Sequence, residues 1–140
     1  MEDLYRLHPI AVHFPIAILI VGWFVALGSK FAKSPAWIAE SAPWFLWTGT
    51  LSAWAALGLG LLAQKTAPHV PPAWETLAEH KELGFWTCGL FTALSIWRIL
   101  AGRRREWILI VLWLVAVGVL AATADHGGDL VYEFGMGVGR

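Results

Sequence analysis

Four long apolar stretches constrain this chain of 140 residues more than any other feature. They cover residues 10–28, 43–64, 83–101 and 107–124. A helix that crosses the hydrocarbon core of a bilayer needs about 20 such residues. A segment in lipid must also satisfy its own backbone hydrogen bonds, so each stretch is expected to be an α-helix. The sequence therefore predicts one integral membrane domain over residues 1–140, an all-α, four-helix transmembrane bundle with up-down-up-down topology.

The composition excludes several other classes of protein. Hydrophobic residues make up 58% of the chain and charged residues 14%, whereas about a quarter of the residues of a soluble domain are charged. Ten basic residues balance ten acidic ones, so no net field attracts a polyanion such as nucleic acid. A single cysteine cannot form an internal disulfide, a C-x-x-C motif or a multi-cysteine metal site. A disordered chain, a nucleic-acid-binding domain and an ordinary cytosolic enzyme are thus unexpected, and the lipid bilayer is the expected partner.

The connections between the stretches differ in character. Residues 29–42 are expected to form a loop, and a second, proline-rich loop begins at residue 65. Pro72 suits the first turn of a helix, so the third span is expected to begin early. The Gly-Arg-Arg-Arg sequence at 102–105 predicts a tight turn and antiparallel packing of the last two spans. No internal repeat is visible in the sequence.

The end of the chain is expected to fold back on the bundle. Gly127 and Gly128 follow the fourth span, and glycine is the usual residue just after a helix. The segment Asp129–Val138 then mixes glycine with aromatic and aliphatic residues, unlike a disordered tail. We therefore expect the fourth helix to stop at the two glycines and a short tail to cover the outer mouth of the bundle.

The basic residues predict the orientation in the membrane. Six of them lie on the side of the first loop and four on the side of the termini. Arginines and lysines beside the spans favour the cytoplasm. We therefore expect Arg103–Arg105 to be cytoplasmic and both termini to be outside, which in a bacterium with an inner membrane is the periplasm.

All five histidines are expected on the side of the termini: His8, His13, His69, His80 and His126. An ionisable group near the apolar core of a membrane needs a partner. We expect His13 to point into the bundle and to approach His80 and His126. His8 precedes His13 by five residues, which rotates it by about 140° on a helix. It is therefore expected to cap the site from above or to serve a neighbouring one.

A small residue lies one turn deeper than each of the three converging histidines, namely Ala17, Gly84 and Ala122. Glycine inside a helix costs about 1 kcal/mol relative to alanine, so Gly84 needs a reason. One reason is a flat ring that lies along the helices. The other is close helix packing through small residues, which membrane bundles use widely.

Paired imidazoles on facing helices suit haem iron, copper or zinc. Haem b fits an apolar bundle best, with four histidines for up to two haems and four aromatic residues as possible walls: Phe14, Trp54, Phe85 and Trp86. Nearby carboxylates are candidates for orienting the imidazoles or for ligating a metal directly: Glu79, Glu82, Asp125 and Asp129. The alternatives are copper or zinc binding, a proton relay, and a structural role without a cofactor.

Three motifs carry a family resemblance: LHPIAVHFPIAILI at 7–20, HKELG at 80–84 and DHGGDLVYEFGMGV at 125–138. Together they resemble a family of predicted bacterial membrane proteins called domain of unknown function 2231. The resemblance covers nearly the whole chain and implies a four-span protein with no assigned reaction. It also implies redox partner proteins, since members of the family are sometimes joined to cytochrome c-like domains. The motif positions here are His8, His13, His80, His126, Gly127, Gly128 and Tyr132, whereas His69 belongs to no motif.

The sequence thus leads to one functional hypothesis and two rivals. We expect a b-type haem-binding protein for electron transfer near the periplasmic face of a bacterial inner membrane. Too little chain lies outside the spans for a substrate pocket of its own, so a subunit of a larger redox complex is favoured over a stand-alone enzyme. The rivals are metal-ion or proton handling by the same histidines, and a structural subunit.

Overall fold

The computed structural model describes residues 4–31 and 33–136, and every regular element in them is a helix. This confirms the predicted all-α fold. Two short 3-10 helices, η1 and η2, accompany five α-helices, of which α1 and α2 form one nearly continuous rod. The bounds are η1 Leu4–Arg6, α1 Leu7–Ala11, α2 His13–Gly28, α3 Ala36–Thr66, η2 Pro71–Ala73, α4 Trp74–Ala101 and α5 Glu106–Tyr132.

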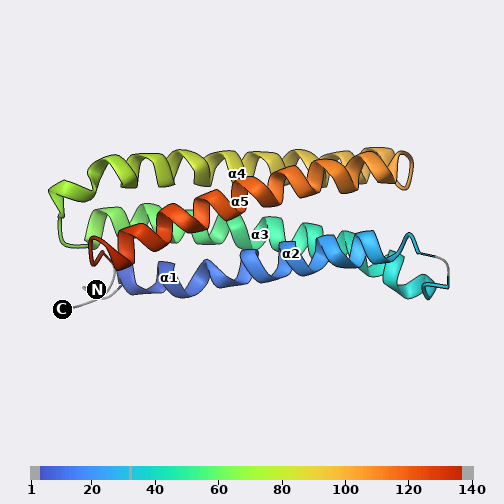
Figure 1. The fold of residues 1–140 in the computed structure, drawn as a ribbon, viewed down its shortest axis with the longest axis horizontal. Coiled ribbons are helices and arrows are strands. Elements are labelled where there is room, and N and C mark those ends of the chain that lie inside the picture. Colours follow the sequence, from blue (N-terminus) through green and yellow to red (C-terminus); the bar gives the residue numbers. More distant parts are fainter. Residues whose placement is uncertain (1–3, 32, 137–140) are drawn as a thin grey trace.

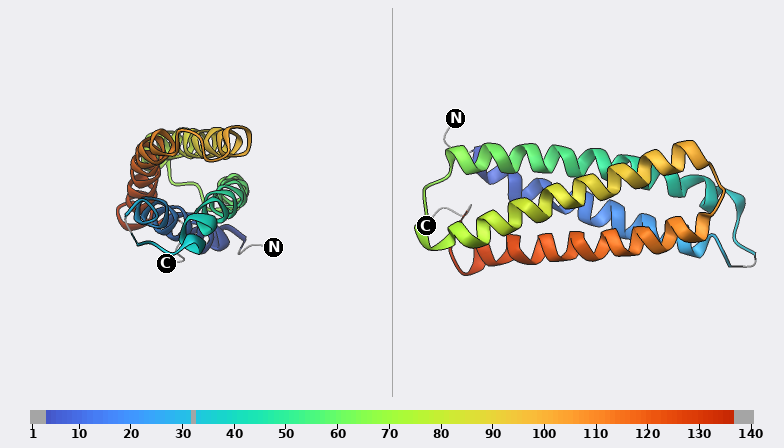
Figure 2. Two further views of the ribbon diagram at one scale, coloured as in Figure 1. Left: turned by 90° about the vertical axis from the view of Figure 1, so that its right-hand side faces the viewer. Right: turned by 90° about the horizontal axis from the view of Figure 1, so that it is seen from above.

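Four helical segments are long and apolar enough to cross a membrane: Leu7–Gly28, Ala36–Thr66, Pro71–Ala101 and Glu106–Tyr132. They lie side by side along one direction (Figure 1) and surround a common axis when viewed end-on (Figure 2). We call the end with η1, η2 and the end of α5 the histidine end. The other end carries the turn Gly102–Arg105 between α4 and α5, and we call it the arginine end.

Two helices extend further than the sequence predicted. The expected loop over 29–42 is shorter, because α3 begins at Ala36 directly after the extended Pro35. The prediction that Gly127 and Gly128 end the fourth helix is wrong, since α5 continues to Tyr132. The chain turns instead at Gly135, whose φ of 66° is left-handed and therefore favours glycine. Of the predicted tail, residues 137 and 138 lie outside the described part.

The turns at the other positions follow the sequence. Pro71 and Pro72 occupy the first turn of η2, which leads directly into α4. The turn over residues 102–105 has positive φ at its two ends, Gly102 at 56° and Arg105 at 57°. The helices therefore form two hairpins, which we call hairpin A (α1, α2 and α3) and hairpin B (α4 and α5). Packing is closer within each hairpin than between α2 and α5.

The two hairpins repeat the same burial pattern, which was not visible in the sequence. The buried residues Pro15, Leu19 and Gly22 of α2 correspond, at one constant separation, to the buried Thr87, Phe91 and Leu94 of α4. A second constant separation relates five buried residues of α3 to five of α5: Ala42, Pro43, Leu46, Gly49 and Ala53 to Leu109, Ile110, Trp113, Ala116 and Leu120. The bundle is therefore a structural repeat of two hairpins.

The largest fully buried side chains make the repeat plain. They are Leu19, Leu46, Phe91 and Trp113, one from each long helix. Leu19 corresponds to Phe91 and Leu46 to Trp113, so equivalent positions hold side chains of different size. A Cβ on Gly22 would clash with the Cβ of Phe45 and would lie 3.0 Å from the Trp113 ring, so this glycine lets both α3 and Trp113 pack against α2.

An ion-pair cluster joins the hairpins at the arginine end. Glu106, at the start of α5, accepts a hydrogen bond from Lys30 of hairpin A. Arg98 and Arg103 lie 3.9 Å and 3.8 Å from the same carboxylate. The Glu106 side chain is only 18% exposed, so its charge depends on these cations.

Candidate cofactor site

At the histidine end, one imidazole from each hairpin approaches the other in an edge-on contact. The rings of His8 on α1 and His80 on α4 have centroids 6.0 Å apart and planes inclined by 74°. Both side chains are partly buried. His8 and His80 are separated by the same interval as Leu19 and Phe91, so the two histidines hold equivalent positions in the repeat. A ligand between them would therefore be bound by matching residues of the two hairpins.

Each ring of this pair is fixed through its Nδ1 atom. The Nδ1 of His8 lies 2.9 Å from the carbonyl oxygen of Ala56, and that of His80 lies 2.9 Å from the carbonyl oxygen of Thr123. A carbonyl oxygen can only accept, so Nδ1 donates the proton in both rings. Nε2 then carries the free lone pair of each neutral imidazole. This is the arrangement by which proteins orient histidines that ligate a metal.

A glycine beneath each ring makes room for it. A Cβ on Gly60 would lie 2.9 Å from the Cε1 of His8, and a Cβ on Gly127 would lie 3.0 Å from the Cε1 of His80. Each glycine lies one turn beyond the carbonyl that accepts from the same ring. Gly127 was expected near the site as a helix stop, and the structure instead gives it a close contact with His80. Gly60 and the two carbonyls were not predicted.

The third predicted histidine, His126, lies beside this pair on α5. Its Nδ1 donates to the carbonyl oxygen of Ala122 at 2.9 Å, and its Nε2 lies 3.5 Å from Oε2 of Glu79. His126 is close enough to His80 to interact with it electrostatically. Its Nε2, however, faces a carboxylate within hairpin B and not hairpin A.

The prediction that His13 points into the bundle is wrong, because its side chain is exposed. The inner face of α2 is formed by Pro15, Leu19, Gly22 and Ala26. His13 lies two residues before Pro15, which is a rotation of about 200° on a helix. Its side chain therefore faces outward, away from Pro15. His8 lies a full heptad before Pro15 and therefore shares the inner face.

The small residues predicted beneath the histidines serve other roles. Ala17 is exposed on the same outer face as His13. A Cβ on Gly84 would lie 3.3 Å from Leu57 of α3, so Gly84 provides close helix packing. A Cβ on Gly128 would meet only the Tyr132 ring, at 3.9 Å. Ala122 contributes its carbonyl oxygen and not space.

The predicted surroundings of the site also differ. The four aromatic side chains expected to wall a slot are exposed on the outside of the bundle: Phe14, Trp54, Phe85 and Trp86. Of the four carboxylates considered, Glu79 is the one with a recorded contact to a described histidine. The orienting acceptors of the three rings are backbone carbonyls, which have no residue signature and could not be found from the sequence.

The pair supplies two imidazole donors, which is the number of ligands that haem iron takes from a protein in an electron-transfer site. Among the residues that the structure describes, no group of three or more His, Cys, Asp or Glu side chains could hold a metal ion. Structural zinc takes four protein ligands. Haem already carries four nitrogens and needs only the two that His8 and His80 offer.

These features define a four-span membrane protein with a paired-histidine site at one end of a two-hairpin bundle. The chain belongs to the family described as "Predicted membrane protein (DUF2231)", whose profile matches residues 5–140. The resemblance that the histidine motifs predicted is thus confirmed. No curated protein and no solved structure matches the chain.

Proposed function

We propose that this protein is an electron-transfer subunit that holds one b-type haem between His8 and His80. The observation that carries the proposal is the close pair of imidazoles, with ring centroids 6.0 Å apart, each with its Nδ1 bound to a carbonyl and its Nε2 without a hydrogen-bond partner in residues 4–31 and 33–136. A haem held by both histidines would supply one-electron transfer.

The chain's own residues would bind and orient the cofactor. Ala56 and Thr123 hold the ring tautomers through their carbonyl oxygens, and Gly60 and Gly127 let both rings lie against helix backbone. Each hairpin contributes one ligand, one carbonyl and one glycine. Because packing is looser between the hairpins than within them, their interface is the place where a macrocycle would enter with the least loss of contacts.

The same geometry supports a single haem. Two haems would need two facing pairs of imidazoles. His13 is exposed and His126 faces Glu79, so these two histidines do not complete a second pair. We therefore propose one haem, in place of the one or two that the sequence suggested.

The basic residues support an orientation for this subunit. The arginine end carries Lys30, Arg98 and Arg103–Arg105 beside the spans, as cytoplasmic ends do. With that end in the cytoplasm of a bacterial inner membrane, the haem lies near the periplasmic face. A cytochrome c-like or another periplasmic redox protein is then the partner, as the family resemblance implies.

An absorption spectrum of the purified protein, produced with haem supplied during expression, tests the proposal. We expect a Soret band, split α and β bands after reduction, and one haem per chain. Bound copper or zinc without a Soret band would favour the metal-handling alternative. A protein that contains neither haem nor metal would favour a cofactor-free structural subunit. Either of these two outcomes would contradict the proposal.

A further inference from the structure

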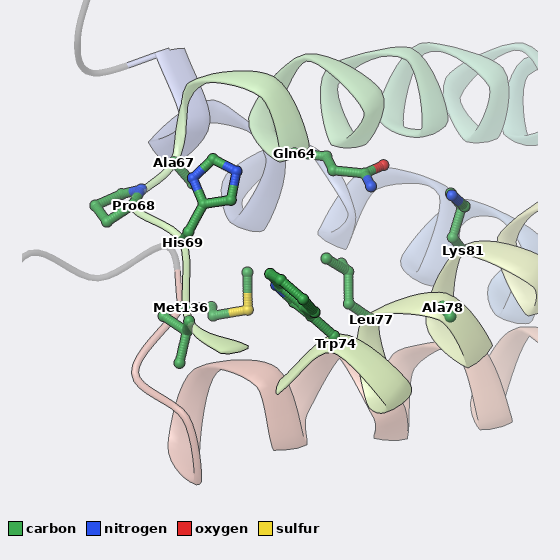
Figure 3. Close-up of a pocket in the computed structure, with 10 residues that line it drawn as sticks. Gln64, Ala67, Pro68, His69, Trp74, Leu77, Ala78, Lys81 and Met136 are labelled. Atoms are coloured by element: carbon green, nitrogen blue, oxygen red, sulfur yellow. The ribbon is translucent and has the colours of Figure 1, made fainter. Parts of the chain in front are cut away.

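A cavity of about 320 Å³ lies at the histidine end, outside the paired-histidine site. The end of α3, the loop that follows it, the start of α4 and Met136 enclose it (Figure 3). His69, which belongs to no sequence motif, lines this cavity together with Gln64, Trp74, Leu77 and Lys81. Ligand pockets begin at about this size.

Three polar side chains line the cavity without a partner among the described residues, and two of them, Gln64 and His69, are exposed. Gln64, His69 and Lys81 form no hydrogen bond or ion pair with any residue that the structure describes. All three can donate hydrogen bonds. The cavity therefore offers free donors to a ligand that carries acceptors.

His69 and Lys81 lie at opposite ends of the cavity. Figure 3 shows the Gln64 side chain between these two and the Trp74 indole below them. Met136 and Leu77 lie beside Trp74 and add apolar surface to the cavity. A phosphate would need donors that converge on one point, whereas this arrangement suits a flat ring with an acceptor at each end.

A shallow, open groove adjoins the cavity on the outer face of α4, and all of its lining residues belong to that helix. It has a volume of about 570 Å³ and shares Ala78 and Lys81 with the cavity. Its other lining residues are Glu82, Phe85, Trp86 and Gly89. These positions lead from the interface toward the middle of the membrane-spanning segment Pro71–Ala101. The groove therefore offers a path in the lipid phase for an apolar chain.

We propose that the cavity and the groove together bind an isoprenoid quinone. The quinone ring lies on Trp74, one carbonyl accepts from His69 and the other from Lys81 or Gln64. The isoprenoid tail lies in the groove beside Phe85 and Trp86. This binding does not depend on haem, so it stands or falls separately from the electron-transfer function proposed above.

A phospholipid fits the same surface less well. Its phosphate would find one cation, Lys81, in a site whose other charged lining residue is the acidic Glu82. Its two acyl chains would also exceed a single groove. Because a phospholipid is abundant in the same membrane, the experiment must still distinguish it from the quinone.

The head-group contacts are tested by equilibrium binding of decylubiquinone, a quinone with an alkyl tail, to the purified protein in detergent. We expect Lys81→Leu and His69→Leu each to weaken binding by about tenfold, because each removes one donor to a carbonyl. Lys65→Leu is the matched control, since Lys65 is exposed near the same end but does not line either cavity. It should bind the quinone like the wild type.

The tail contacts are tested by filling the groove. A Cβ on Gly89 would meet nothing within 4 Å, and the same holds for Gly118 on α5. Gly89→Leu should therefore fold normally, block the groove and weaken decylubiquinone binding by about tenfold. It should leave binding of the tail-free quinone head unchanged. Gly118→Leu is the control and should change neither.

Three results would overturn the proposal. The first is no binding of decylubiquinone to the wild type. The second is equal binding by the Lys81, His69 and Gly89 variants and their controls. The third is displacement of the quinone by phosphatidylglycerol vesicles at equal concentration, with Lys81→Leu abolishing phosphatidylglycerol binding, because that would assign the site to an anionic phospholipid.

Discussion

His8 and His80 lie with their ring centroids 6.0 Å apart, and each belongs to a different hairpin of the bundle. Both donate from Nδ1 to a backbone carbonyl on the neighbouring helix of their own hairpin. The contact thus joins two equivalent halves at their equivalent residues. It ties the fold, a repeat of two hairpins, to the proposed cofactor site.

The space beneath the rings gives a prediction about two glycines. Gly60→Ala and Gly127→Ala should displace His8 and His80, because the new methyl group would lie about 3 Å from each ring. We expect each to lower the free energy of unfolding by about 1–3 kcal/mol. Chemical denaturation in detergent measures this quantity.

Gly58 and Gly118 are the matched controls, since a Cβ at either position meets nothing within 4 Å. Alanine in a helix is favoured over glycine by about 0.5–1 kcal/mol. Gly58→Ala and Gly118→Ala should therefore stabilise the protein slightly. The same small gain in the Gly60 and Gly127 variants would contradict the close contact with the histidines.

The ion-pair cluster at the arginine end predicts a loss of stability. Glu106→Gln keeps the size of the side chain but removes the charge that Lys30, Arg98 and Arg103 share. Leaving partly buried cations without their partner should lower the free energy of unfolding by about 1–3 kcal/mol. The exposed Glu75, which forms no ion pair within residues 4–31 and 33–136, is the control, and Glu75→Gln should change the stability by less than about 0.5 kcal/mol.

The orientation in the membrane is open to a direct test. A reporter fused after Arg140 should be active in the periplasm, and one inserted in the turn Gly102–Arg105 should be active in the cytoplasm. The reason is the cluster of basic residues beside the spans at the arginine end. The opposite pair of signals would place the histidine end inside the cell and exclude a periplasmic redox partner.

Much of the fold could be predicted from the sequence, because hydropathy and length decide which segments cross a membrane. Each of the four predicted windows lies inside one of the helical segments of the structure. The turn at Gly102–Arg105 was also predictable from its residues. The end of α5 was not, since the glycine pair Gly127–Gly128 continues as helix and one of the two packs against a ring.

The inner face of each helix was harder to predict for a physical reason. In a membrane protein the face toward lipid is as apolar as the face toward the core, so the period of hydrophobic residues carries little information. His8 and His13 could therefore not be told apart by hydropathy. The spacing of small residues indicates which histidine faces the bundle. Gly22 and Ala26 mark the packing face of α2, and His8 lies two heptads before Gly22.

The repeat escaped sequence analysis because the two hairpins fill equivalent positions with different residues. Leu19 corresponds to Phe91, Leu46 to Trp113 and Gly22 to Leu94, and all six are buried. In each of these three pairs the larger side chain belongs to hairpin B, so the two halves differ in the size as well as the identity of their core residues. What the halves share is the position of one histidine, one glycine and one carbonyl acceptor.

The most direct test of the central claim is the absorption spectrum of single histidine variants purified with haem. We predict that His8→Ala and His80→Ala lose the haem or become high-spin, because each loses one axial nitrogen. His13→Ala and His126→Ala should keep the low-spin spectrum of the wild type. An unchanged spectrum in both His8→Ala and His80→Ala, or loss of haem in His13→Ala, would contradict a haem held between His8 and His80.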